Sequence, residues 1–324
     1  MKNILLIVFT ALFAMVMTPA SGSVASAAEI RLATQPIPQY APIFVAKHKG
    51  FIDEELARIG EKAVVKWSSF AAGPPINESF AAGQQDFGFL GDVPAIIGKA
   101  AGINTKIIAL TSAGPTSLAV IVPTRSGIKS PKDLKGKKIG VVKGSYAHHL
   151  LLLVLQKGGL TANDIELINL SQADIATAII AGNIDAAAVW EPLLTKLTVQ
   201  GSVRVLADGT GIKKGVLVII GTNDFVTRNR AKTKALLRAY ERGVVFIKAH
   251  PQEAASLIAA DVNLPADLLV KVFQKLDYNP SIQPEDIAEI KRSELFLRSS
   301  GLIKSDVNID TFADVSLTKE LGIK

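Results

Sequence analysis

The sequence contains no cysteine and few aromatic residues. Its 324 residues include four histidines and two tryptophans, and aromatic side chains make up 6% of the total. Without cysteine the chain can form no disulfide framework, thiolate zinc site or iron–sulfur cluster, and it has no cysteine nucleophile. It also lacks the Gly-x-Ser-x-Gly elbow, the Gly-x-x-x-x-Gly-Lys phosphate loop and the His-Glu-x-x-His zinc motif. We therefore expect neither a cofactor nor a metal.

The rest of the composition is that of a folded protein. Hydrophobic residues make up 48% and charged residues 20% of the chain, so there is enough apolar surface to offset the entropy lost on ordering. At roughly 100–200 residues per domain, the length predicts two domains. The formal net charge of +7 favours an anionic small ligand.

The densest positive cluster lies near the middle of the chain. It comprises Lys129, Lys132, Lys135, Lys137 and Lys138. An acid, Asp133, lies inside it, and no aromatic residue is interleaved for base stacking. Ser130-Pro131 is typical of an N-cap followed by the first residue of a helical turn. We interpret the cluster as a solvated turn and expect no nucleic-acid partner.

The first 27 residues have the pattern of a secretory signal peptide. Lys2 is followed by an apolar run over residues 4–17 and then by Ala25-Ser26-Ala27, a small-residue cleavage pattern. The alternative is a membrane anchor, but the run is shorter than the ~20 apolar residues that span a bilayer. The pattern predicts cleavage after Ala27 and export of the mature protein to the periplasm.

Segments typical of strands and helices alternate along the mature chain. Such alternation predicts an α/β fold with largely parallel sheets. The order also repeats: residues 82–86 (AGQQD) match residues 181–185 (AGNID), and each pentad is followed by an apolar strand and then by Pro94 or Pro192. Similar pentads at matching places favour duplication of a βαβα unit. The predicted fold is two-lobed, with two parallel or mixed sheets flanked by helices.

Two apolar, β-branched segments flank the second unit, at residues 117–124 and 215–225. If both are strands that cross between the lobes at a hinge, the second lobe is an insertion in the first. The predicted first lobe then comprises residues 28–116 and 216–324, and the second lobe residues 117–215. Amphipathic or proline-led segments predict helices that cap the first lobe, at residues 231–250, 251–262, 265–276 and 284–301.

The candidate site lies in the loops that follow the predicted strands, because ligands of open α/β sheets collect beyond the carboxyl ends of the strands. The most informative loop is KGSYAHH, residues 143–149. Ser145 there precedes a helix whose free N–H groups attract anions; the alternative is that Ser145 only caps this helix. Trp190, at the end of a strand, either walls a pocket or packs in the core.

Four titratable residues near these loops are candidates for catalysis or metal binding. Asp92 and Glu191 follow strands at equivalent places in the two units, so they are candidates for a carboxylate pair that meets across the cleft. Loop capping is the alternative for Asp92. His148 and His149 are adjacent and project about 100° apart on a helix, which does not suit a shared metal.

Three stretches around these loops resemble a known family. They are residues 70–96 (FAAGPPINESFAAGQQDFGFLGDVPAI), 130–160 (SPKDLKGKKIGVVKGSYAHHLLLLVLQKGGL) and 186–197 (AAAVWEPLLTKL). The chain resembles the alkanesulfonate- and taurine-binding proteins of ABC importers, within the wider nitrate, sulfonate and thiamine-precursor group. The KGS turn with a following histidine, and Gly91-Asp92 with Pro94, favour the alkanesulfonate branch over the nitrate branch.

The resemblance implies a two-lobed periplasmic binding protein fold of type II that closes on a small organic anion. It also implies a monomer that docks on an ABC permease in the inner membrane. The ligand contacts it implies are Gln35, Gly73, Gly91, Asp92, Ser112, Ser145, Tyr146, His148 and Trp190. Family members often have a small or hydroxyl residue where this chain has Tyr146, so this ring either narrows the cleft or forms an aromatic wall.

An aliphatic sulfonate, either an alkanesulfonate or taurine, is the ligand that the resemblance favours, bound without chemical conversion. Three other kinds of ligand stay open: nitrate or bicarbonate, an aromatic sulfonate, and a pyrimidine thiamine precursor. A secreted enzyme that uses Asp92 and Glu191 is the alternative from a different functional class.

Overall fold

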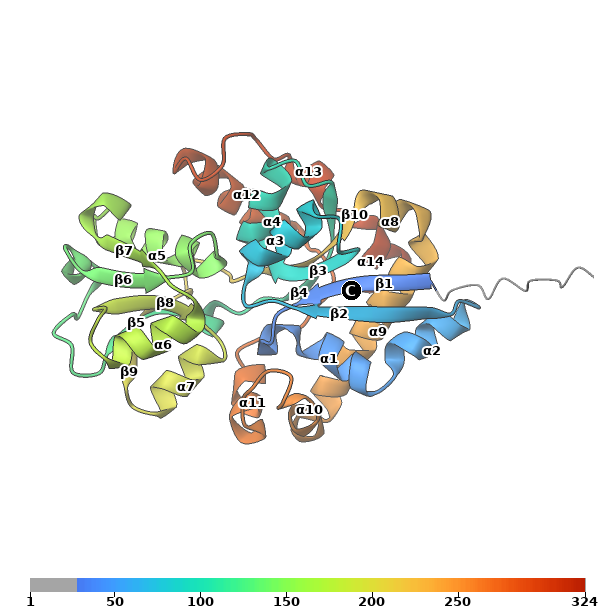
Figure 1. Ribbon diagram of the computed structural model, residues 1–324, viewed down its shortest axis with the longest axis horizontal. Helices are drawn as coiled ribbons and strands as arrows, with labels where there is room; N and C mark the ends of the chain where they lie inside the picture. The colour runs from blue at the N-terminus through green and yellow to red at the C-terminus, as the bar shows by residue number, and fades with distance from the viewer. Residues whose placement is uncertain (1–27, 324) are drawn as a thin grey trace, which may run out of the picture.

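The computed structural model describes residues 28–323, which form two lobes side by side (Figure 1). Each lobe contains one five-stranded sheet, so the predicted two-lobed α/β fold is confirmed. The predicted signal peptide, residues 1–27, lies outside the described residues. Within them, every helix is too short or too polar to cross a membrane.

The sheet of the first lobe has the strand order β2-β1-β3-β10-β4. Its strands are β1 (Ala28–Thr34), β2 (Ala63–Ser69), β3 (Phe87–Gly91), β4 (Thr105–Ser112) and β10 (Leu217–Thr222). β1 runs parallel to both β2 and β3. The carboxyl ends of these three strands therefore point toward the second lobe (Figure 1).

Helices cover both faces of this sheet (Figure 1). On one face lie α1 (Ala41–His48), α2 (Phe51–Arg58), α9 (Arg230–Ala249) and α10 (Pro251–Ile258). On the other lie α3 (Gly73–Ala81), α4 (Asp92–Ala100) and α12 (Pro284–Ser299). The shorter helices α8 (Asn223–Arg228), α11 (Ala266–Phe273), α13 (Ile309–Phe312) and α14 (Ser316–Glu320) complete the lobe.

The sheet of the second lobe has the order β7-β6-β8-β5-β9. Its strands are β5 (Leu118–Pro123), β6 (Lys138–Val141), β7 (Glu166–Asn169), β8 (Ala186–Trp190) and β9 (Val203–Asp208). Helix α5 (Tyr146–Lys157) covers one face, and α6 (Gln172–Ile180) and α7 (Leu193–Val199) cover the other. β8 is buried on both faces: Ala187 and Val189 pack with α6 and α7, while Ala188 and Trp190 belong to the core on the α5 side. This period of two directs Trp190 toward α5.

Both sheets are mixed, because each contains one strand that runs against its neighbours. β10 is antiparallel to β3 and β4, and β5 is antiparallel to β8 and β9. These are the two segments predicted to cross between the lobes. Each strand lies within a single sheet, and the chain crosses in the adjoining stretches 113–117 and 209–216. The crossings lie side by side, because the Gly114 N–H donates to the Lys214 carbonyl at 3.1 Å.

The repeated pentad forms the same structure in both lobes. Its glycine ends α3 in one lobe and α6 in the other, with φ of 68° and 76°. The aspartate three residues later, Asp86 or Asp185, accepts a 2.8 Å hydrogen bond from the backbone N–H of Arg31 in β1 or Lys138 in β6. Each aspartate also donates its own N–H back to the same residue at 2.8 Å. The pentad therefore ties each helix to the first strand of its unit.

Candidate ligand-binding site

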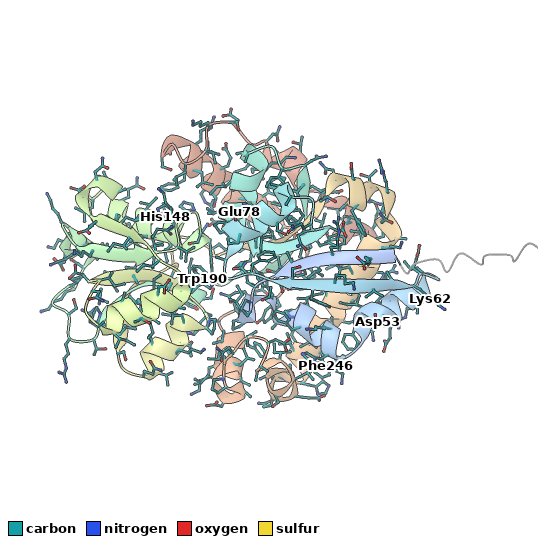
Figure 2. The ribbon with its side chains drawn as sticks, viewed as in Figure 1. Asp53, Lys62, Glu78, His148, Trp190 and Phe246 are labelled. Atoms are coloured by element: carbon teal, nitrogen blue, oxygen red, sulfur yellow. The ribbon has the colours of Figure 1, made fainter. Side chains whose placement is uncertain are left out.

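A small cavity lies between the lobes, where strands of both sheets end. The residues that line it are Gln35, Ile37, Tyr40, Gly73, Gly91, Pro94, Ser145, Tyr146, Trp190 and Leu217. The structure thus brings together Gln35, Gly73, Gly91, Ser145, Tyr146 and Trp190 from the contacts that the resemblance implies. Figure 2 shows Trp190 at the junction between the two sheets.

The cavity is small in this closed arrangement. Its volume is about 10 Å³, which is room for about one water molecule. A sulfonate or carboxylate group with its organic part is larger than that. Binding of such a ligand therefore requires the lobes to separate or the aromatic side chains to move.

The first lobe contributes glycines and helix N-termini to the cavity. Gly73 is the first residue of α3, and Gly91 immediately precedes α4. A Cβ atom at Gly73 would lie 2.4 Å from Pro94 Cγ, and one at Gly91 would lie 3.3 Å from Tyr146 Cβ. Larger side chains at these two positions would therefore oppose close contact between the elements around the cavity.

Gln35 follows β1 and is held in a fixed position. Its Nε2 donates to Tyr40 Oη at 3.1 Å and to the Phe89 carbonyl at 3.2 Å. The residue is only 4% exposed. Its amide is therefore oriented by the first lobe before any ligand arrives.

The second lobe contributes the N-terminus of α5. Ser145 caps this helix, as one interpretation of the sequence predicted: its Oγ accepts the His148 N–H at 3.1 Å. The hydroxyl proton of Ser145 stays free to donate. Within residues 28–323 the N–H of Tyr146 has no hydrogen-bond partner. With the helix dipole behind them, these donors suit a negatively charged group.

Tyr146 and Trp190 form an aromatic wall. Their ring centroids are 5.6 Å apart, with the ring planes inclined by 49°. Tyr146 Oη accepts a 3.1 Å hydrogen bond from Gln39 Nε2 of the first lobe, so this side chain also joins the lobes. Burial raises the pKa of both Tyr146 and Tyr40 well above the usual range. Both phenols therefore keep their protons at neutral pH.

Asp92 lies outside the cavity, although the resemblance implies a ligand contact there. Its carboxylate is fully buried, with Oδ2 accepting from Lys213 Nζ at 2.7 Å and from Ser293 Oγ at 2.6 Å. Oδ1 accepts the Val93 N–H at 2.9 Å. Lys213 lies in the second crossing, and its Nζ is 3.9 Å from Glu289 of α12. Asp92 therefore fastens α4 to α12 and to the crossing, instead of facing a ligand.

Glu191 is held in the same manner by a different lysine. Its Oε1 accepts from Lys275 Nζ at 2.6 Å and from Thr195 Oγ1 at 2.9 Å. Lys275 follows α11 of the first lobe, so this ion pair also joins the lobes. Since Asp92 is bound to Lys213 and Glu191 to Lys275, the two carboxylates do not form the pair across the cleft for which their positions in the sequence made them candidates.

Ser112 and His148 also lie outside the cavity. Ser112 is fully buried at the end of β4, opposite Leu217, and its Oγ has no hydrogen-bond partner in the described part of the chain. His148 follows Tyr146 by two residues, a rotation of about 200° around the helix. Its ring therefore lies on another side of α5, in a separate groove (Figure 2).

Several apolar lining residues were not identified from the sequence. They are Ile37, Tyr40, Pro94 and Leu217. Such side chains are typical of any core, so their type gives no sign of a ligand. Tyr40 could have been identified from its position, because it ends the loop that begins with Gln35 after β1.

A larger hollow of about 290 Å³ lies beside the loops that line the cavity. Residues from both lobes line it, among them Ala72, Pro74, Glu78, Lys143 and Gln172. Ala72 and Pro74 flank Gly73, and Lys143 lies two residues before Ser145, so the same loops line this hollow and the cavity. Lys143 is the cation among the described residues that line this hollow.

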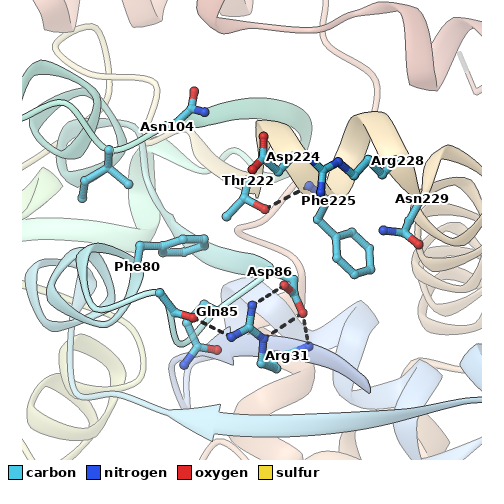
Figure 3. Close-up of a pocket in the computed structure, with 12 residues that line it drawn as sticks. Arg31, Phe80, Gln85, Asp86, Asn104, Thr222, Asp224, Phe225, Arg228 and Asn229 are labelled. Atoms are coloured by element: carbon cyan, nitrogen blue, oxygen red, sulfur yellow. Dashed lines mark hydrogen bonds and ion pairs between the residues drawn. The ribbon is translucent and has the colours of Figure 1, made fainter. Parts of the chain in front are cut away.

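Another hollow, of about 410 Å³, lies at the end of the first lobe that is remote from the cavity (Figure 3). Arg31 on its floor is held by Asp86, with Nη2 2.6 Å from Oδ1 and Nε 3.1 Å from Oδ2. The Arg31 guanidinium also donates to the Gly83 carbonyl. Its charge is therefore neutralised within the pentad, and the contacts support the fold.

Sequence comparison identifies relatives of this chain. The family model described as NMT1/THI5-like matches residues 37–254. A protein of Escherichia coli (strain K12) named for binding aliphatic sulfonates is 32% identical over 216 residues, 67% of each chain. A protein of Bacillus subtilis (strain 168) with the same name is 32% identical over 306 residues, 92% of this chain and 91% of that protein.

Solved structures agree with these relatives. The periplasmic aliphatic sulphonate-binding protein SsuA from Escherichia coli has a TM-score of 0.78 at 26% identity, covering 89% of this chain and 97% of that one. SsuA from Xanthomonas axonopodis pv. citri, bound to MOPS, has a TM-score of 0.80 at 25% identity, covering 90% and 99%. The desulfurization enzyme DszB shares the fold, with a TM-score of 0.71 at 19% identity, covering 92% and 99%.

These comparisons confirm the resemblance to alkanesulfonate-binding proteins that the loops around the cavity suggested. The relatives named above for sulfonates are binding proteins, whereas DszB shows that the fold can also carry an enzyme. The family model spans more than half of the chain. The chain therefore belongs to the NMT1/THI5-like family.

Proposed function

We propose that this protein captures an aliphatic sulfonate, either an alkanesulfonate or taurine, for an ABC importer. One observation carries the proposal: Gln35, Gly73 and Gly91 meet Ser145, Tyr146 and Trp190 at a single cavity between the lobes. The names of the relatives supply the ligand class. The sulfonate oxygens accept hydrogen bonds from the Ser145 hydroxyl and the first amides of α5, and the aliphatic part lies against the two rings.

The proposed site holds the anion with hydrogen-bond donors and helix dipoles. The lysines beside the carboxylates that follow β3 and β8, Lys213 and Lys275, are already paired with Asp92 and Glu191. Three helices, α3, α4 and α5, begin at the lining residues. Their N-termini each carry a partial positive charge of about half a unit. A singly charged group is therefore matched without an unpaired lysine in the cavity.

Closure of the lobes is the proposed mechanism of capture, without chemical conversion. Each lobe supplies part of the wall, so the ligand makes all its contacts only in the closed state and shifts the equilibrium toward it. The pairs Gln39–Tyr146 and Lys275–Glu191 join the lobes in that state. The loaded protein, a monomer, then docks on a permease in the inner membrane.

Two further parts of the proposal concern the organisation of the chain. Residues 1–27 direct the protein to the periplasm and are removed. The first lobe comprises residues 28–116 and 216–324, and the second comprises residues 117–215. The location of every strand of the second sheet within residues 118–208 supports this division.

Thermal-shift screening tests the ligand class. Taurine, ethanesulfonate, nitrate and a pyrimidine are compared, because a ligand at 100 times its dissociation constant stabilises the folded protein by about 2.7 kcal/mol. A shift with the sulfonates alone supports the proposal. A shift in the unfolding temperature with nitrate or the pyrimidine alone would assign that compound, in place of a sulfonate, as the ligand. Turnover of a sulfonate by the wild-type protein would favour an enzyme.

Substitutions in the aromatic wall and the cap test the location. Ser145→Ala combined with Trp190→Ala should weaken binding of the best sulfonate by roughly a hundredfold, about 2.7 kcal/mol, because a donor and an apolar contact are both lost. The matched control is Ser130→Ala with Trp67→Ala, which changes the same residue types outside the cavity. Unchanged calorimetric binding by the cavity variant would remove the proposed site.

A further inference from the structure

A second groove bridges the two lobes next to the proposed ligand site. Its volume is about 530 Å³, and it lies between α5 of the second lobe and the C-terminal end of α12 in the first. Its apolar walls are Leu152, Leu160, Leu167, Phe296 and Leu302. None of its lining residues within the described chain is an aspartate or a glutamate. The groove is therefore largely apolar and has no negative charge on its walls.

His148 supplies a hydrogen-bond donor at one end of the groove. Its Nδ1 accepts the Gly144 N–H at 3.3 Å, so the proton of the neutral ring is on Nε2. Burial, together with the charge of Lys143, lowers the pKa of His148 to about 4, and the ring is neutral at pH 7. Within residues 28–323, Nε2 has no hydrogen-bond partner, and this atom is not fully enclosed. The Nε2–H group is thus available to an acceptor.

Lys143 supplies the positive charge at the same end. Its side chain is exposed and lines both this groove and the 290 Å³ hollow beside the cavity loops. A cation, a neutral donor and a long apolar wall occur together here. This combination is complementary to a molecule that has an anionic head and an alkyl chain.

We propose that this groove is a second binding site, for an amphipathic anion. The head, a carboxylate or a sulfonate, accepts a hydrogen bond from His148 Nε2 and pairs with Lys143, and the alkyl chain lies against Leu152 and Phe296. Because the walls come from both lobes, the occupant binds the closed arrangement better than the open one. It therefore raises the affinity of the cavity for its own ligand. This coupling rests on the proposed closure, whereas binding in the groove does not.

Calorimetric titration of the mature protein with octanoate tests the groove. Octanoate has the proposed chemistry but lacks the sulfonate expected in the cavity. We expect Leu152→Glu to weaken octanoate binding roughly tenfold or more, because it places a carboxylate on the apolar wall. The matched control is Leu153→Glu, since Leu153 is the next residue of α5, is also half-buried and does not line the groove. Octylammonium, which has the same chain length and the opposite charge, should not bind.

Two results would overturn the second site. Equal octanoate affinity in Leu152→Glu and wild type would place the occupant elsewhere. Loss of octanoate binding in Trp190→Ala would place it in the cavity. If Leu152→Glu does not fold, His148→Phe replaces it, and the same weakening is expected from loss of the donor. Failure of both ethanesulfonate and taurine to bind would reject the proposed function but would leave the octanoate result standing.

A second titration tests the coupling between the two sites. The affinity for ethanesulfonate should rise roughly fivefold or more when octanoate is saturating, and this rise should disappear in Leu152→Glu. An ethanesulfonate affinity that does not change with octanoate would overturn the coupling.

Discussion

The two lobes contain the same βαβα unit but present different side chains to the cavity. In both, the pentad aspartate binds the first strand through a 2.8 Å hydrogen bond. Where the following strand ends, however, the first lobe has Gly91 and the second has Trp190. Both lobes therefore offer helix N-termini to the cavity, and the second lobe adds an aromatic wall. The shared hydrogen bonds set the positions of the loops, and the side chains at their ends decide what the loops bind.

The carboxylates that follow these strands differ in a second respect. Asp92 and its partner Lys213 are both fully buried, whereas Glu191 is buried but the side chain of Lys275 is 32% exposed. The first pair lies between α4, α12 and a crossing. The second lies at an edge of the lobe contact that water reaches. Loss of the lysine should therefore destabilise the fold more at Asp92 than at Glu191.

The largest predicted effect distinguishes these ion pairs. Lys213→Met should lower the free energy of unfolding by about 3–5 kcal/mol, because it leaves the Asp92 carboxylate buried without its cation. Lys275→Met should cost only about 1–2 kcal/mol, since Glu191 keeps Thr195 and water can take the place of the ammonium group. Urea denaturation measures both. Adding Asp92→Asn to Lys213→Met should recover part of the loss, and equal losses in the two single variants would contradict the comparison.

The next effect concerns the histidines that α5 places near the contact between the lobes. His149 stacks on Phe296 of the first lobe at 4.2 Å, and burial lowers its pKa to about 2. The corresponding value for His148 is about 4, and both lie below the ~6.5 of an unfolded chain. The unfolded state therefore binds more protons in acid. The stability that these groups contribute is complete above pH 6.5. It falls as the pH drops toward 4, and for His149 it continues to fall below pH 4.

Substitution of His149 tests this dependence. Each buried histidine should remove about 1.4 kcal/mol of stability per pH unit in that range, or about 2 kcal/mol by pH 5. His149→Phe keeps the aromatic contact with Phe296 and removes one of the two proton-linked losses. Its stability measured from pH 7.5 to pH 5 should therefore fall about half as steeply as that of wild type. A slope equal to that of wild type would show that His149 is not buried in a neutral state.

The smallest predicted effect compares the pentad aspartates. Asp86→Asn should cost about 2 kcal/mol, because this carboxylate accepts from both the backbone and the guanidinium of Arg31. Asp185→Asn should cost about 1 kcal/mol, because within residues 28–323 the Asp185 carboxylate accepts only from the backbone N–H of Lys138. Thermal unfolding of the two variants measures the difference. A larger loss of stability in Asp185→Asn than in Asp86→Asn would contradict the conclusion that the aspartate of the first lobe makes the stronger contacts.

Most elements with a clear periodicity were predicted from the sequence. The helix expected over residues 231–250 corresponds to α9, and the segments expected as strands over residues 117–124 and 215–225 contain β5 and β10. β9 was not predicted, because its residues show no regular alternation of buried and exposed side chains. α7 was missed because it has seven residues, too few for a clear helical period.

Only part of the candidate site was predicted from the sequence, because the direction of a side chain depends on distant parts of the chain. Gln35, Gly73 and Ser145 follow strands, so the topology brings them to the same cleft. Asp92 follows a strand as well, yet Lys213, 121 residues away in the chain, binds its carboxylate away from the cavity. His148 lies on the same helix as Tyr146 but points into another groove, and only the orientation of α5 against both lobes determines that.

The sequence by itself determined the alternation of strands and helices, the duplicated unit and the loops that surround the cavity, because these depend on the order of residues close together in the chain. The tertiary structure decided which side chains face the cavity, which carboxylates are neutralised and how far the closed lobes fill the space between them. Those outcomes depend on partners distant in the chain, such as Lys213 for Asp92 and Gln39 for Tyr146, and no local pattern specifies such partners.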